Sequence, residues 1–90
     1  MLNIIRANRF VKDLRPAIKR GFKIELLDEV VTKLANQEKL PDKYCDHPLF
    51  GTYKDFRECH IQPNWLLIYS IDEEDLELYL FRTGTHSDLF

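Results

Sequence analysis

The order of apolar and polar residues at the start of the chain predicts a short strand and then a helix. Residues 2–6 form a run of apolar and β-branched side chains typical of a strand, and Asn8 is a residue type that caps helices. Pro16 predicts a kink or a split in this helix, because proline removes a backbone hydrogen-bond donor. Gly21 can close the helix in the left-handed conformation, and Phe22 could then fold back on Ile18. The apolar residues at helical spacing are Phe10, Leu14, Ala17 and Ile18.

A second apolar stripe predicts a second helix, which should end near residue 37 or 38. The segment that follows, up to Leu49, contains Pro41 and Pro48 and is expected to be a loop, which would place His47 on a loop. The stripe repeats at steps of three and four residues and consists of Ile24, Leu27, Val30, Val31 and Leu34.

The second half of the chain shows the alternation of strands. Residues 65–71 are almost continuously apolar and suit a central strand, and the acidic run 72–75 is predicted to be a turn. The last four residues, 87–90, are too short for an element of their own. In residues 56–61 alternation puts Phe56, Glu58 and His60 on one face and Arg57, Cys59 and Ile61 on the other. In residues 76–82 it puts Leu76, Leu78, Leu80 and Arg82 together, before residues 83–85 leave the sheet.

These elements predict an α+β fold in one domain spanning residues 1–90. The expected order is an N-terminal strand, two helices and a three-stranded antiparallel meander, which together form one twisted sheet. Both helices need a sheet face to bury their apolar stripes, so we expect them on the same face. The opposite face is then free to act as a binding surface.

Composition and charge agree with a small folded domain. Hydrophobic residues make up 44% and charged residues 31% of the chain. No segment approaches the length of a membrane span and the first residues lack the features of a secretion signal, so we expect a cytoplasmic protein without a membrane partner. The net charge is −2, but residues 1–44 carry ten Lys and Arg against six Asp and Glu. The basic excess lies largely on the first helix, where it could meet a polyanion such as RNA or simply be solvated.

All three histidines, His47, His60 and His86, lie in the second half of the chain, together with Arg57 and Arg82. Imidazole exchanges protons near neutral pH, and guanidinium binds phosphate with a planar fork of donors. RNA contains its own nucleophile, the 2′-hydroxyl, so its cleavage needs only a base, an acid and a cation that stabilises the transition state. This chemistry makes RNA cleavage a functional hypothesis.

Within this hypothesis each residue has a candidate role. His60 with Glu58 nearby, or His47, could act as the base, and His86 as the acid. Arg82, with Arg57 as a second candidate, would hold the phosphate. The alternation turns Arg57 toward the core side, where an ion pair at the sheet edge is a competing interpretation. A splayed base could stack on Phe90 or Tyr53.

Simpler interpretations remain open at this stage. A single histidine in a small domain is more often a surface or packing residue than a catalyst. A metal site built from Cys45, Cys59, His47 and His60 is an alternative, but the sequence lacks the short ligand spacing of structural zinc sites. We therefore expect reduced cysteines that pack in the fold, with no metal and no cofactor.

Several motifs resemble the RelE/YafQ superfamily of bacterial toxins, and most closely its YafQ-like branch. The resemblance covers nearly the whole chain in element order. Its specific motifs are Asp46-His47-Pro48-Leu49, residues 53–60, Pro63-Asn64-Trp65, and Arg82-Thr83-Gly84-Thr85-His86 with Leu89-Phe90.

The resemblance implies a ribonuclease toxin of a type II toxin-antitoxin pair. Such a toxin cuts messenger RNA, usually on the ribosome, is silenced by a cognate antitoxin, and contacts operator DNA only in complex with that antitoxin. It also implies His86 as the chief catalytic residue, His47 and His60 as supporting groups, Arg82 as the phosphate clamp and Phe90 as a stacking contact. Where the YafQ-like branch typically has aspartate before the tryptophan, this chain has Asn64, which cannot accept a proton and is therefore grouped with the substrate contacts.

Two other functions compete with the ribonuclease. A relative that keeps the fold but inhibits a protein target such as gyrase would need no catalytic residues, and the full set of histidines argues against it. A plain interaction module is the third hypothesis.

Overall fold

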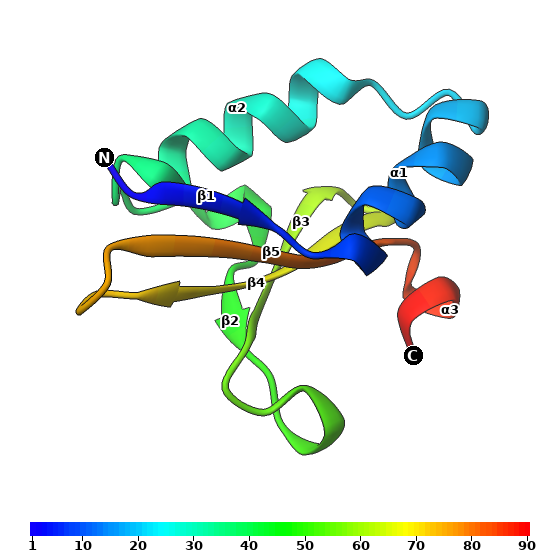
Figure 1. Cartoon of the computed structure of the whole chain (residues 1–90). Helices are drawn as coiled ribbons and strands as arrows, with labels where there is room; N and C mark the ends of the chain where they lie inside the picture. The colour runs from blue at the N-terminus through cyan, green and yellow to red at the C-terminus, as the bar shows by residue number, and fades with distance from the viewer.

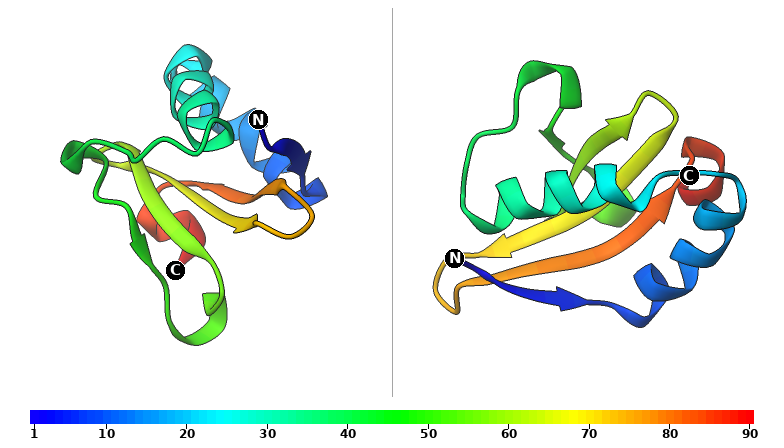
Figure 2. Two further views of the ribbon diagram at one scale, coloured as in Figure 1. Left: turned by 90° about the vertical axis from the view of Figure 1, so that its left-hand side faces the viewer. Right: turned by 90° about the horizontal axis from the view of Figure 1, so that it is seen from above.

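The computed structural model describes residues 1–90 as a five-stranded mixed sheet with two helices on one face and a single helical turn on the other (Figures 1 and 2). No helix has the length and apolar character needed to cross a bilayer. The main elements in chain order are β1 (Asn3–Arg6), α1 (Asn8–Lys19), α2 (Ile24–Ala35), β2 (His47–Pro48), β3 (Arg57–Gln62), β4 (Trp65–Asp72), β5 (Glu77–Gly84) and α3 (His86–Leu89).

The strand order across the sheet is β1-β5-β4-β3-β2. β3, β4 and β5 form the predicted antiparallel meander, and β1 pairs with β5 in parallel. The prediction missed one strand, since residues 47–48 were expected in a loop but pair with β3 as the short edge strand β2. A strand of two residues, one of them Pro48, gives too little alternation to be recognised from sequence.

The helix α1 differs in detail from its prediction. Ala7, in extended conformation, is the N-cap in place of Asn8, and Pro16 lies inside an uninterrupted helix. Gly21 has the predicted left-handed conformation, with φ of +88°. Phe22 was expected to fold back on Ile18, but its ring stacks on Trp65 at 4.9 Å between centroids, which leaves Ile18 57% exposed.

The helix α2 and the last strand have slightly different bounds from those predicted. α2 ends at Ala35, and Gln37 already has positive φ, so the chain turns two residues earlier than expected. Leu76 also has positive φ and belongs to the turn, so β5 starts at Glu77 and continues to Gly84.

The main core lies between the sheet and the two long helices. Trp65, Leu67 and Tyr69 on β4 point into it and are at most 1% exposed. The alternate residues of the same strand, Leu66 and Ile68, are equally buried but belong to a separate small cluster on the other face. β4 is therefore covered on both sides, as its continuously apolar sequence predicts.

A β-bulge at Phe81 changes the direction of the side chains at the end of β5. Tyr69 pairs with Leu80 but Ile68 pairs with Arg82, so Phe81 is an extra residue without a partner. Simple alternation placed Arg82 on the face of Leu80. The bulge instead places Arg82 opposite Ile68, on the face away from α1 and α2, so this part of the sequence prediction was wrong.

The C-terminal residues form an element that the sequence did not predict. The turn α3 begins with a capping box, in which the Thr85 hydroxyl accepts a hydrogen bond from the Asp88 amide and the Asp88 carboxylate accepts one from the Thr85 amide. Leu89 of α3 packs on Leu66 and Ile68. The prediction of helices on one face thus holds for α1 and α2, while α3 covers the opposite face.

Candidate functional site

The register of the sheet places four residues in one row across β2, β3, β4 and β5. His47 pairs with Glu58, Glu58 with Ile68, and Ile68 with Arg82. Directly paired residues point to the same face, so His47, Glu58 and Arg82 all belong to the face opposite the long helices. With strands about 4.8 Å apart, Glu58 and Arg82 stand roughly 10 Å from each other with Ile68 between them.

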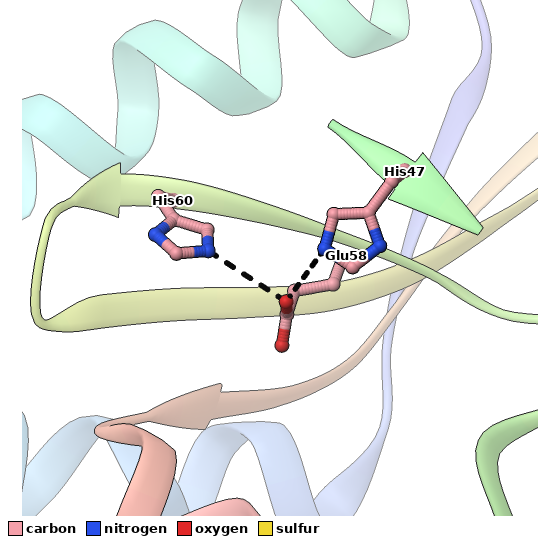
Figure 3. Close-up of side chains that lie close together, drawn as sticks. All are labelled: His47, Glu58 and His60. Atoms are coloured by element: carbon pink, nitrogen blue, oxygen red, sulfur yellow. Dashed lines mark hydrogen bonds and ion pairs between the residues drawn. The ribbon is translucent and has the colours of Figure 1, made fainter. Parts of the chain in front are cut away.

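Glu58 is the centre of a group of three side chains on β2 and β3 (Figure 3). Its Oε2 lies 2.9 Å from Nε2 of His47 and 3.6 Å from Nε2 of His60. The alternation of β3 puts Glu58 and His60 on the same face, as predicted, and the pairing of β2 brings His47 beside them. Both imidazoles therefore share one carboxylate oxygen.

The carboxylate of Glu58 is buried, whereas the histidines are accessible. The Glu58 side chain is 8% exposed, against 48% for His47 and 29% for His60. Its second oxygen, Oε1, is buried without any hydrogen-bond partner. A buried carboxylate with one free oxygen favours a cation beside it, because charge is costly to bury unless it is paired.

Arg82 is held in place by an acidic residue from α1. Its Nε donates to Oδ2 of Asp13 at 2.7 Å and its Nη2 donates to Oδ1 at 3.2 Å, and this hydrogen bonding raises the pKa of the Arg82 guanidinium. Asp13 also accepts a hydrogen bond from the Thr83 amide, where β5 runs on beyond the end of β1. Nη1 is the one guanidinium nitrogen that is not bonded to Asp13.

His86 and Phe90 form a second group, on α3. Their rings stack with centroids 4.8 Å apart, and Tyr53 meets Phe90 edge to face at 5.3 Å. The Tyr53 hydroxyl donates to the carbonyl of Leu89, which fixes α3 to the loop before β3. His60, Leu66 and Gly84 are register partners, so His86, two residues after Gly84, follows at the same end of the sheet.

Two predicted substrate contacts lie apart from these groups. Arg57 pairs with Tyr69, on the helix side of the sheet, and its guanidinium bonds to Asp46 at 3.3 Å, which is the edge ion pair that alternation predicted. Asn64 is exposed in the turn between β3 and β4. Cys59 also points to the helix side and is fully buried, so the metal group of cysteines and histidines considered from the sequence does not form.

Asp13 was not found by sequence reasoning. It lies in a basic helix 69 residues before Arg82, and no local pattern links the two. Arg20, which bonds to Asp88 of α3 at 2.6 Å, was missed for the same reason.

A small mixed sheet with two long helices on one face and a short C-terminal helix on the other places the chain in the RelE-like class of α+β domains. The family model described as "Bacterial toxin of type II toxin-antitoxin system, YafQ" matches residues 2–90. The chain therefore belongs to the YafQ family of bacterial toxins of type II toxin-antitoxin systems.

Individual relatives agree with this assignment. The mRNA interferase toxin YafQ of Escherichia coli K12 is 39% identical over 85 residues, which cover 93% of this chain and 90% of that protein. A metal-bound toxin from Helicobacter pylori is 49% identical, with a TM-score of 0.93 over 100% of both chains. A chain of the E. coli DinJ-YafQ complex is 37% identical, with a TM-score of 0.88 over 100% of this chain and 99% of that one.

Proposed function

We propose that this toxin is an endoribonuclease that cleaves messenger RNA by attack of the 2′-hydroxyl on the adjacent phosphate, without a metal ion. The observation that carries the proposal is the row of His47, Glu58, Ile68 and Arg82 on one sheet face. In this row the acid-base candidates His47 and Glu58 lie on one side of Ile68, and the phosphate-binding cation Arg82 lies on the other. The E. coli relatives named mRNA interferase toxin support the choice of substrate.

In the proposed reaction the group of His47, Glu58 and His60 removes the proton of the 2′-hydroxyl. His47 is hydrogen-bonded to Oε2 of Glu58, and Nε2 of His60 lies 3.6 Å from the same oxygen, so a proton taken by Glu58 can be passed to either imidazole. The 2′-oxygen then forms a bond to phosphorus, and Arg82 stabilises the negative charge through the guanidinium nitrogen that Asp13 leaves free.

The bond between phosphorus and the 5′-oxygen then breaks, and His86 protonates the leaving oxygen. Phe90 stacks on a neighbouring base of the RNA, and Asn64, in the β3–β4 turn, contacts the RNA strand. The products are a 2′,3′-cyclic phosphate and a free 5′-hydroxyl. Arg57 has no part in this scheme, because its guanidinium is bound to Asp46 on the other side of the sheet.

The proposed partners follow from the relatives. The DinJ-YafQ complex supports a cognate antitoxin protein that binds and silences this chain. We further propose that cleavage takes place on the ribosome, and that operator DNA is bound only by the toxin together with its antitoxin.

The test is primer extension on messenger RNA after induction of the wild type and of His86→Ala, with analysis of the product ends. We expect cleavage in the wild type, its loss in His86→Ala, and 5′-hydroxyl ends. Equal cleavage in both would overturn the role of His86, and 5′-phosphate ends would indicate a metal-activated water instead. Growth arrest without RNA cleavage would favour an inhibitor of a protein target.

A further inference from the structure

β2 is the shortest strand of the sheet, although it supplies His47 to the site. It is two residues long, and one of the two is Pro48, which has no N–H to donate to β3. Beyond it the Leu49 amide still donates to the Phe56 carbonyl at 2.9 Å. Backbone pairing therefore holds this strand by few hydrogen bonds, and the direction of the His47 side chain depends on further contacts.

Asp46, the residue before β2, supplies such a contact. Its Oδ1 accepts a hydrogen bond from the hydroxyl of Tyr69 at 2.5 Å, and its two oxygens accept longer bonds, of 3.3 Å, from Nε and Nη2 of Arg57. Tyr69 belongs to the central strand β4 and is 1% exposed. The Asp46 carboxylate is thus anchored to a fixed point of the core, with the Arg57 guanidinium as its counter-charge.

The contact between Tyr69 and Asp46 joins a hydroxyl donor to a carboxylate. Burial, followed by the hydrogen bond to Asp46, raises the pKa of Tyr69, so the hydroxyl keeps its proton at neutral pH. A hydroxyl that donates to a carboxylate forms a charge-assisted hydrogen bond, which is roughly twice as strong as one between neutral groups. Tyr69 therefore resists any movement of Asp46 away from β4.

Asp46 and His47 make two side-chain contacts back to back at the edge of the sheet. Both reach consecutive residues of β3, Arg57 and Glu58. Asp46 meets Arg57 on the helix side of the sheet, while His47 meets Glu58 at 2.9 Å on the opposite face (Figure 3). Consecutive residues of an extended chain point to opposite faces, so a contact that fixes one of them also fixes the direction of the other.

We propose that Asp46 is a positioning residue, which Tyr69 anchors and which keeps the side chain of His47 directed at the catalytic face of the sheet. The catalytic part of this proposal rests on the proposed ribonuclease function. Asp46 touches no reacting group, because its carboxylate is bonded on the helix side, and it acts only through the direction of His47. Arg57 has the same indirect role, as the counter-charge of Asp46.

Three variants test the proposal. Tyr69→Phe removes only the hydroxyl and keeps the ring that fills the core, and Asp46→Ala removes the whole contact. Tyr79→Phe is the matched control, because it removes the hydroxyl of another strand tyrosine, whose ring packs on Phe56 and Phe81 and whose hydroxyl makes no hydrogen bond to another residue. Thermal unfolding shows that each variant is folded before it is compared with the wild type.

The first measurement follows the ring nitrogens of His47 by NMR in the free chain, where no RNA is needed. A ring nitrogen that is hydrogen-bonded to a carboxylate has different chemical shifts from one that faces water. We expect the His47 signals of Asp46→Ala and Tyr69→Phe to move toward those of Glu58→Gln, while the His86 signals stay unchanged. His47 signals identical to those of the wild type in both variants would overturn the proposal.

The second measurement is messenger RNA cleavage on purified ribosomes over a range of toxin concentrations, which separates the maximal rate from the half-saturating concentration. A positioning residue contributes to the transition state and not to binding, so its loss lowers the maximal rate alone. We expect a fall of about 10- to 100-fold in Asp46→Ala, no larger than that in His47→Ala, and no change in Tyr79→Phe. A weaker half-saturation at unchanged maximal rate would make Asp46 a binding residue and overturn the proposal.

A double-mutant cycle separates the positioning of His47 from a general loss of structure. If Tyr69 acts through His47, Tyr69→Phe has no further effect on the maximal rate once His47 is replaced by Ala. Equal losses in both backgrounds would overturn the proposal, because they would be independent of His47. If the wild type cleaves no RNA, the proposed function fails, and the NMR signals of His47 still decide whether Asp46 positions this side chain.

Discussion

Thr83 connects the buried indole of Trp65 to the backbone of β4. Its hydroxyl accepts a hydrogen bond from Nε1 of Trp65 at 2.8 Å and donates one to the carbonyl of Leu66 at 2.7 Å. Thr83 is 1% exposed and Trp65 is fully buried. Since an unpaired buried donor keeps the full cost of its desolvation, this hydroxyl is expected to contribute to stability.

We predict that Thr83→Val lowers the free energy of unfolding by about 1–3 kcal/mol, because it leaves the indole N–H and the Leu66 carbonyl without this partner. Thr83→Ser keeps the hydroxyl and loses only a methyl group, so it is the matched control and should lose less. Urea unfolding followed by Trp65 fluorescence measures both. A Thr83→Val chain as stable as the wild type would show that the hydrogen bonds are replaced by other partners.

At the scale of elements, α3 depends on a few polar contacts. The bidentate ion pair to Arg20 and the capping box with Thr85 both use the carboxylate of Asp88. The hydrogen bond from Arg20, followed by that from the Thr85 amide, lowers the pKa of Asp88 well below its ordinary value of 3.8. The charged form of Asp88 is thus the form that holds α3 in place.

We predict that acid weakens α3 before the rest of the fold. A carboxyl group with a lowered pKa stabilises the folded state fully above pH 3.8, its unfolded value, and this contribution is lost as the pH falls toward the folded value. The stability difference between the wild type and Asp88→Asn should therefore be constant near neutral pH and shrink below about pH 4.

Hydrogen exchange of the Leu89 and Phe90 amides measures this opening directly. Thr85→Ala removes the other half of the capping box and should favour opening by about 1 kcal/mol at neutral pH. A stability difference between the wild type and Asp88→Asn that grows as the pH falls below 4 would contradict the lowered pKa of Asp88.

The sequence predicted the elements well where side-chain periodicity is local. The alternation of β3 correctly joined Glu58 and His60, since their relation depends on a spacing of two residues. The predicted face of Arg82 was wrong, because one bulged residue shifts the alternation of side chains along the strand. Bulges leave little trace in the sequence. The pair of Arg82 and Asp13 could not be predicted, because it depends on how α1 docks against the end of β5.

At the scale of the whole molecule, charge is separated between the two parts of the chain. Residues 1–44 have a net charge of +4 and residues 45–90 a net charge of −6, as counted from the sequence. On α1 the exposed basic residues include Lys12, Arg15 and Lys19. A polyanion would therefore be attracted to this helix despite the negative total.

We predict that the triple change of Lys12, Arg15 and Lys19 to Glu weakens RNA binding and makes it less dependent on salt. Each lost phosphate contact should reduce the slope of log affinity against log salt by about 0.7 for a single strand. Fluorescence anisotropy with a labelled RNA at several salt concentrations measures the slope. Lys39→Glu, an exposed site away from α1, is the control, and an unchanged slope in the triple variant would exclude α1 as an RNA contact.

The extra residue Phe81 determines to which face of the sheet the side chains at the end of the chain point. If β5 were regular and Phe81 had a partner of its own, strict alternation would turn the guanidinium of Arg82 toward the face of Trp65 and the hydroxyl of Thr83 outward. The residues that follow, including His86, would then leave the sheet pointing to the opposite face. Deleting Phe81 would instead leave Arg82 directly after Leu80 and still opposite Ile68, so the deletion should remove the stacking of this ring on Phe56 but keep the orientation of Arg82 and His86.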